Sequence, residues 1–178
     1  TNITDAGSYS RGVKNNFSGK IDGLGHTIDR LTIYHPGGAG WDTGGTGFFA
    51  GAYNSTGITA EVSNLGLTNM SQTSIRSFAG AFIGRCRTNC SATIKNSYAT
   101  GVITNSTNSG NALGGFVGLV EGTLNIKNSF SNVAVTGSGQ SYAGGNEGVG
   151  GLIGRTGASA TVSIMNSHNR GSVTGTNS

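Results

Sequence analysis

Acid–base catalysis or calcium binding by this 178-residue chain would depend on its seven acidic residues. Enzymes that cleave polysaccharides need two carboxylates, or a carboxylate and a basic partner, within reach of one bond. The carboxylates follow no regular spacing and stand at Asp5, Asp22, Asp29, Asp42, Glu61, Glu121 and Glu147. Because no pattern gathers them, we expect no catalytic residue and predict that the chain is not an enzyme.

Histidine and cysteine, the usual ligands of transition metals, form no recognisable ligand set. His26, His35 and His168 share no metal-binding spacing, and no second cysteine pair accompanies Cys86 and Cys90. The two cysteines predict a local disulfide that closes a small turn, with two unpaired thiols as the alternative. Since a disulfide favours an oxidising compartment, we expect an extracellular or cell-surface location, no metal and no cofactor.

Basic residues recur more regularly than acidic ones. Lys95 and Lys127 hold the same place in two sequence repeats, and Arg85 and Arg155 each follow a glycine-rich apolar run. A stack of such cations predicts a stripe that binds sulfated or sialylated glycans, but a solvated face is the alternative that we favour. The formal net charge of +4 is modest, and the dense basic clusters of nucleic-acid-binding proteins are missing. We expect no nucleic-acid partner.

Two repeated motifs predict the elements that position these side chains. In the first, an apolar residue precedes asparagines at positions 64, 96, 128 and 166, which are 32, 32 and 38 residues apart. In the second, apolar pairs flanked by glycine begin at positions 48, 82, 116 and 152, which are 34, 34 and 36 residues apart. Two independent motifs with nearly one period indicate stacked structural repeats.

Each repeat contains three short β-branched runs bounded by Gly, Asn or Ser, and no run has the spacing of an amphipathic helix. The sequence therefore predicts an all-β parallel β-helix, or β-solenoid, of about four to five coils. We expect one domain over residues 1–178, with a lead-in at 1–16 and an opening coil at 17–61 that carries an insertion at 34–46. Repeats then begin near residues 62, 94, 126 and 164.

Parallel stacking places like residues above one another, so the repeats predict columns. The asparagines would form a ladder of side-chain amides at a turn; they are Asn64, Asn96, Asn128 and Asn166. Eight residues further on, Gln72 interrupts a column of Thr104, Thr136 and Thr174. A threonine column raises a minor alternative, an ice-binding face.

Several motifs resemble the GLUG repeat of bacterial surface proteins. They are the Gly-Gly-Phe-Val-Gly run at 114–118, the Ile-Lys-Asn-Ser-Tyr-Ala-Thr-Gly run at 94–101 and the opening segment at 17–28. The resemblance spans about 17–178 and implies a right-handed β-helix within large secreted or surface-attached proteins. Such hosts include haemagglutinin-like adhesins and immunoglobulin-A-cleaving metalloproteases, in which the repeats are not catalytic. The cysteine turn and Ala50 depart from the usual repeat.

Binding is expected where segments interrupt the repeat, because loops on a rigid scaffold usually carry it. The insertion contains Tyr34 and Trp41, and a second long loop contains Tyr142. These aromatic residues are the predicted ligand contacts, ahead of Lys95, Lys127 and Arg155; a Trp41 that covers one end of the solenoid is the alternative.

The predicted function is an extracellular adhesion segment, a rigid stalk that presents loops to glycans or proteins of host or bacterial surfaces. The alternatives are a structural spacer, a filament unit that associates end to end, and an accessory region of a secreted protease. No apolar run reaches the length of a membrane span, so we expect no direct membrane insertion.

Overall fold

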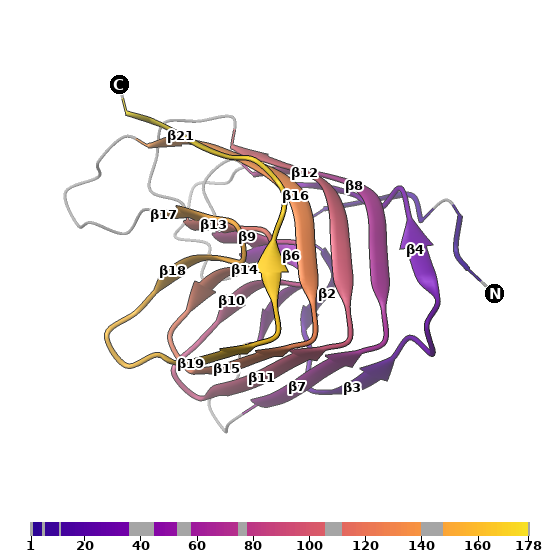
Figure 1. Ribbon diagram of the computed structural model, residues 1–178, viewed down its shortest axis with the longest axis horizontal. Coiled ribbons are helices and arrows are strands. Elements are labelled where there is room, and N and C mark those ends of the chain that lie inside the picture. The colour runs from indigo at the N-terminus through magenta and orange to yellow at the C-terminus, as the bar shows by residue number, and fades with distance from the viewer. Residues whose placement is uncertain are drawn as a thin grey trace.

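The computed structural model describes residues 2–4, 6–10, 12–35, 45–52, 58–74, 78–105, 112–139 and 148–177. Within these ranges every regular element is a β-strand, and the strands pair in parallel between successive coils (Figure 1). The predicted all-β parallel solenoid is confirmed.

Three sheets run along the solenoid. Sheet A contains β1 (Ser8–Ser10), β4 (Thr27–Asp29), β5 (Thr32–Tyr34), β8 (Gly66–Ser74), β12 (Tyr98–Asn105), β16 (Phe130–Gly139), β20 (His168–Asn169) and β21 (Val173–Asn177). Sheet B contains β2 (Gly12–Asn16), β6 (Gly45–Ala52), β9 (Phe78–Gly80), β10 (Ile83–Cys86), β13 (Ala112–Gly114), β14 (Val117–Val120), β17 (Gly148–Gly150) and β18 (Ile153–Thr156). Sheet C contains β3 (Gly19–Asp22), β7 (Ile58–Ser63), β11 (Cys90–Lys95), β15 (Thr123–Lys127) and β19 (Thr161–Met165).

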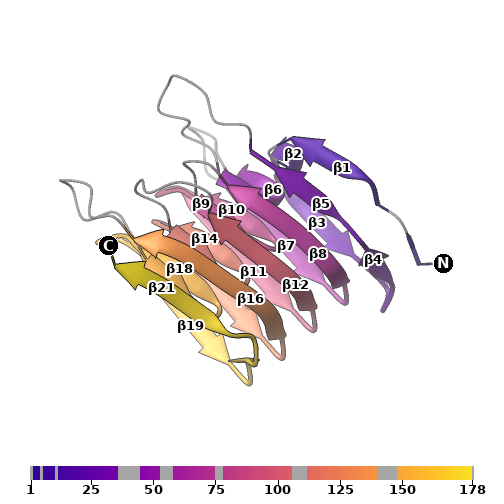
Figure 2. The same ribbon diagram turned by 90° about the horizontal axis from the view of Figure 1, so that it is seen from above.

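The chain visits sheet C, then sheet A, then sheet B in every coil, and the coils stack along the long axis (Figure 2). Three regular turns lead from β7 to β19 after the opening coil, slightly fewer than the four to five coils expected. Part of the lead-in also belongs to the solenoid, since β1 pairs with β5 and β2 pairs with β6.

Alternation of side chains explains why these runs form strands. In β11, Ala92 and Ile94 are buried whereas Thr93 and Lys95 face outward, the pattern of a sheet with one buried face. Ile94 lies opposite Val62 and Ile126 on the neighbouring coils, and all three are at most 1% exposed. This aliphatic column therefore forms the core beneath sheet C.

A second column fills the core beneath sheet B. Phe82 and Phe116 are fully buried, and their rings meet edge to face with centroids 5.2 Å apart. The amide of Phe82 donates to the Phe116 carbonyl, and the amide of Phe116 donates to Leu152. Burial of one large apolar side chain per coil at each of these positions holds successive coils together.

One extra residue in β8 corrects the predicted threonine column. Asn69 has a φ of 50°, and the register between β8 and β12 shifts between the Leu67–Ala99 and Met70–Gly101 pairs. Because of this bulge, Thr73 lies opposite Thr104. Gln72, the residue expected in the column, instead points into the core opposite Ile103 and is fully buried.

Candidate functional site

Strands of sheet A end, and the following strands of sheet B begin, along one edge of the solenoid. Tyr34, Thr73, Thr104 and Thr136 align in register at or near the ends of β5, β8, β12 and β16. The following strands of sheet B begin at Gly45, Phe78, Ala112 and Gly148. We call this edge, between the ends of these sheet A strands and the starts of these sheet B strands, the loop edge (Figure 2).

Of the three aromatic residues predicted to contact a ligand, the structure places one. Tyr34 is the last residue of β5, lies on the outward face beside Thr73 and is 46% exposed. Trp41 and Tyr142 lie outside the described residues. Both belong to segments whose flanking strands end at the loop edge, which is also where Tyr34 stands.

A stack of aromatic rings runs along the outer face of sheet A. Tyr98 and Phe130 are parallel within 5° at 5.1 Å between centroids, and His168 continues the stack at 5.8 Å. The guanidinium of Arg170 lies 5.9 Å from the centre of the Phe130 ring. Gly66, on the preceding coil, leaves room for the Tyr98 ring, because a Cβ at position 66 would lie 2.5 Å from Tyr98 Cζ. Since the rings face one another, they leave little of their faces as a platform for a sugar ring.

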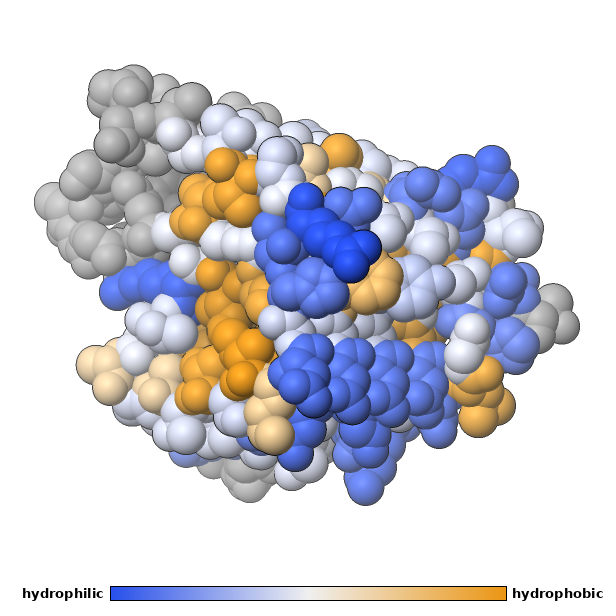
Figure 3. Space-filling model, in the orientation of Figure 1, coloured by the Kyte–Doolittle hydropathy of each residue, from blue (hydrophilic) through white to orange (hydrophobic). Residues whose placement is uncertain are grey.

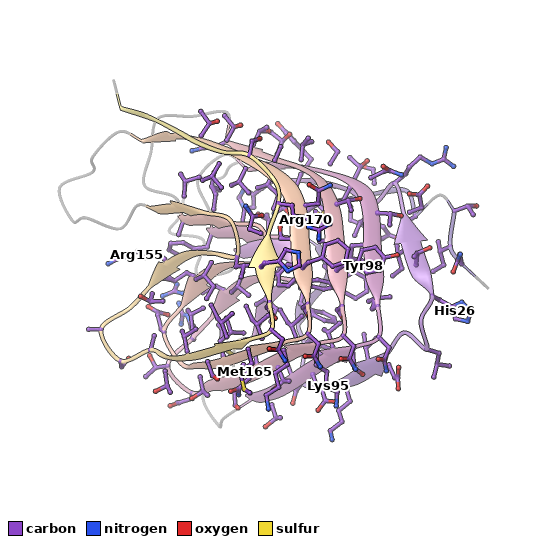
Figure 4. All side chains as sticks on the ribbon, in the orientation of Figure 1. His26, Lys95, Tyr98, Arg155, Met165 and Arg170 are labelled. Atoms are coloured by element: carbon purple, nitrogen blue, oxygen red, sulfur yellow. A yellow bond between two sulfur atoms is a disulfide. The ribbon has the colours of Figure 1, made fainter. Side chains whose placement is uncertain are left out.

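The predicted basic residues do not form one stripe. Lys95 and Lys127 are neighbours on sheet C, whereas Arg155 lies in β18 of sheet B (Figure 4). Arg155 and Arg85 are also two coils apart, with Leu119 between them in the register. The repeat period gave the level of each residue along the axis, but the side of the solenoid depends on which strand carries it.

Two of the described acidic residues neutralise basic neighbours across coils. Glu61 lies 2.8 Å from Lys95 Nζ and 3.7 Å from Lys20 Nζ. The hydrogen bond from Lys95 is the main cause that lowers the pKa of Glu61. Glu121 accepts two bonds of 2.9 Å from the Arg85 guanidinium. Lys127 is exposed, and none of the described acidic residues pairs with it.

The asparagines form a continuous chain of side-chain hydrogen bonds at the corner between sheets C and A. Each Nδ2 donates to the preceding coil: Asn166 to Asn128 at 3.3 Å, Asn128 to Asn96 at 3.2 Å, and Asn96 to Asn64 at 3.1 Å. All four have φ between 47° and 52°, a left-handed conformation that asparagine tolerates better than most residues. The ladder follows a hydrophilic row on the surface (Figure 3).

Asp22 extends the ladder beyond the predicted asparagines. Its Oδ1 accepts from Asn64 Nδ2 at 2.9 Å and from the Leu24 amide at 2.9 Å. These two bonds, the Asn64 bond first, lower the pKa of Asp22. Asp22 was not predicted in this role because it precedes the aligned position by one residue, with Ser63 as its partner in the register.

A column of serines behind the asparagines was also missed. Ser97 Oγ donates to the Lys95 carbonyl at 2.8 Å and accepts from the Leu65 amide of the preceding coil at 3.2 Å. Ser129 and Ser167 repeat both bonds one coil further each time. The hydroxyl thus satisfies an amide that the left-handed turn directs away from backbone acceptors. The repeated Asn-Ser pair was the available signal.

The bulge of β8 is held by a second carboxylate. Asp29 Oδ1 accepts from Thr68 Oγ1 at 2.7 Å and from Asn69 Nδ2 at 2.8 Å. The Thr68 bond is the main cause that lowers the pKa of Asp29, and the Asn69 bond is the next. Both bonds join residues about one coil apart, and no repeated pattern indicates them.

The predicted disulfide between Cys86 and Cys90 is confirmed. It links the end of β10 to the start of β11, and both cysteines are at most 4% exposed. The amide of Cys90 donates to the Arg87 carbonyl at 2.7 Å, which closes the turn. The bond therefore fastens the corner between sheets B and C in one coil.

The four described carboxylates bind neighbouring side chains, and across the described ranges no three His, Cys, Asp or Glu residues gather as a metal site. No helix long and apolar enough to cross a membrane occurs in these ranges. What the arrangement offers is a scaffold of stacked coils joined by side-chain and backbone hydrogen bonds, with the loop edge along one side. No family model matches the chain, and neither curated proteins nor solved structures give a match.

Proposed function

We propose that the chain is a rigid segment of an extracellular surface or secreted protein and that its loop edge adheres to glycan or protein ligands. The observation that carries this proposal is that the strands flanking the insertion and the second long loop, β5 and β6 and then β16 and β17, end and begin along one edge. A binding site on a rigid scaffold loses little conformational entropy when its ligand binds, and this favours affinity.

The stiffness of the scaffold supports a stalk. The asparagine ladder, the serine column and the two apolar columns link every coil to the next. The disulfide supports an oxidising environment, since such bonds persist mainly outside the cytosol. A non-catalytic role is part of the proposal, because each described carboxylate already bonds a neighbouring side chain.

Binding to arrays of glycans and of surface proteins tests the proposal. Tyr34→Ala, Trp41→Ala and Tyr142→Ala should each weaken any interaction that the unaltered chain shows. The matched control is Thr93→Ala, which alters an outward residue of sheet C away from the loop edge. Equal loss in the control variant, or no binding by the unaltered chain, would contradict the adhesive role and leave a structural spacer.

End-to-end self-association is a second candidate, favoured by apolar side chains that are exposed on β19 and β21. Ile164, Met165 and Val173 are 46%, 52% and 44% exposed, whereas Ile126 and Val135 on the preceding coil are fully buried. Apolar surface gathers between β18, β19 and β20 (Figure 3). Light scattering tests this candidate: the mass should rise with concentration in the unaltered chain and less in Ile164→Glu. A constant monomeric mass would exclude it.

A further inference from the structure

The outward side of sheet A differs in charge from the other two sheets of the solenoid. Its three central strands, β8, β12 and β16, lie side by side and contain no Asp, Glu, Lys or Arg (Figure 1). By contrast, β3, β7, β11 and β15 of sheet C each carry a charged residue, and so do β10 and β18 of sheet B. We call the outward side of β8, β12 and β16 the neutral face.

Two rows of side chains cross the neutral face from coil to coil. In register, the rows are Ser71, Val102 and Ala134, and Thr73, Thr104 and Thr136. Val102 is 43% exposed, whereas Ile103, the next residue of β12, is fully buried. The hydroxyls of Thr73 and Thr104 bond each other at 3.4 Å, and Thr104 Oγ1 donates to the Gln72 carbonyl at 3.4 Å. Since these hydroxyls already have partners within the chain, a molecule that covers them leaves no polar group unpaired there.

The composition of the neutral face matches the core of a protein–protein interface. Such cores are depleted of charged residues and enriched in aromatic ones, and their rims are polar. The stacked rings of Tyr98 and Phe130 stand at the first residues of β12 and β16, on the same side as Val102. The charged residues Asp29 and Arg170 belong to the flanking levels of sheet A, where a rim would lie.

The surface around the neutral face is large enough for a specific interface. The level formed by β4 and β5 lies on one side of it, and the level formed by β20 and β21 lies on the other. These five levels, each about eight residues long at about 3.3 Å per residue and about 4.8 Å apart, span roughly 600 Å². Specific interfaces begin at about 600 Å² per partner. Val102, on the middle level, lies near the centre of this surface.

A second copy of the chain is the partner that this surface fits. The net charge of +4 makes two copies repel each other, but the absence of charge on the neutral face removes close like-charge contacts there. Both copies also have the same spacing between coils, so the rows of one can pack along the rows of the other. Sheets that pack face to face in this way lie about 10 Å apart, with strand directions within about 30° of each other.

We propose that the neutral face is the interface of a symmetric dimer in which two chains pack sheet A against sheet A. The interface lies on the sheet rather than at the loop edge, so the dimer does not depend on the adhesive role. It also differs from end-to-end association, because a twofold contact uses the same surface on both copies and closes at two chains.

Light scattering over a range of concentrations tests the dimer. The mass of the unaltered chain should rise from one chain to two and stop there. Val102→Glu sets two like charges against each other near the twofold axis, so the dimer Kd should rise at least about tenfold. The matched control, Asn125→Glu, adds the same charge to the outward side of sheet C and should leave the Kd unchanged. Ile164→Glu, which weakens end-to-end association, should also leave this dimer intact.

Two outcomes of this experiment would overturn the proposal. One is a dimer that Val102→Glu does not weaken. The other is a mass that stays at one chain at every concentration, which would leave the neutral face to a different kind of partner, such as an uncharged polysaccharide.

Val102→Cys tests the same contact by cross-linking. Both native cysteines are joined in a disulfide, so the introduced thiol is the free one. Mild oxidation should link two chains through position 102, which a denaturing gel without reductant shows as a band of twice the mass. Asn125→Cys, the matched control on sheet C, should stay a single chain at the same concentration. Equal cross-linking of the two variants would contradict a dimer centred on the neutral face.

Discussion

The carboxylate of Asp22 accepts a hydrogen bond from the Asn64 amide at 2.9 Å, and this contact orients the entire ladder. An ionised carboxylate can only accept, so Asn64 must turn its Nδ2 toward Asp22 and its Oδ1 toward Asn96. The side-chain amide of each following asparagine has the same orientation. A flipped ladder would set the Asn64 carbonyl oxygen against the carboxylate.

Asn96 tests what the ladder contributes to stability. Asn96→Gly removes two side-chain bonds but keeps a backbone that tolerates φ of 48°, so unfolding should become easier by about 1–3 kcal/mol. Asn96→Ala should cost a further ~1 kcal/mol or more, because a Cβ disfavours the left-handed region. Urea denaturation measures both changes. Equal stabilities of the two variants would show that the backbone conformation is not what selects asparagine.

Acid should destabilise the fold through Asp22, Asp29 and Glu61. Their hydrogen bonds lower the pKa of each group in the folded state, so their stabilising effect is present above the unfolded values of about 3.9 for Asp and 4.3 for Glu. It is lost as the pH falls through the folded values. Thermal unfolding from pH 7 down to pH 2 should show a melting temperature that falls below about pH 4.

Asp29→Asn supplies the matched comparison for the acid effect. The amide keeps the size of the side chain but loses the charge that accepts from Thr68 and Asn69, so stability should drop at neutral pH. The difference from the unaltered chain should shrink as the pH falls. A difference that stays constant with pH would exclude Asp29 as a contributor.

The period predicted the fold because stacked parallel coils place equivalent residues above one another. The apolar residue that precedes each asparagine therefore marks both the spacing of the coils and a column of the core, which contains Val62, Ile94 and Ile126. The predicted alignment of side chains was wrong in β8, which contains one extra residue. The repeat pattern does not show this extra residue. Asn69 shifts the register by one, and the threonine column acquires Thr73 while Gln72 turns inward.

Ion pairs between coils were the other part that could not be predicted from the sequence. Glu61 and Lys95, like Arg85 and Glu121, lie more than one coil's length apart in sequence and on different repeat positions. No repeated pattern marks such pairs, because each occurs once. The serine hydroxyls do recur, but their role depends on the left-handed turn beside them.

The disulfide should add modest stability without deciding the fold. It closes a loop with a sequence separation of only 4, so the Cys86→Ala/Cys90→Ala variant should lose about 2 kcal/mol. Reduction of the unaltered chain should give the same shift in urea, and the variant should not respond to reductant. A variant that fails to form the β-rich fold by circular dichroism would contradict this estimate.

Gln72 should be a position where the chain gains stability. Its side chain is fully buried between Ile33 and Ile103, and neither its amide nitrogen nor its oxygen has a hydrogen-bond partner among the described residues. Burial of unpaired polar atoms costs about 1–3 kcal/mol, so Gln72→Leu should raise stability by a similar amount. The matched control, Ile103→Gln, places a second amide in the same column and should lower stability. A lower melting temperature in Gln72→Leu would show that the amide is satisfied in solution.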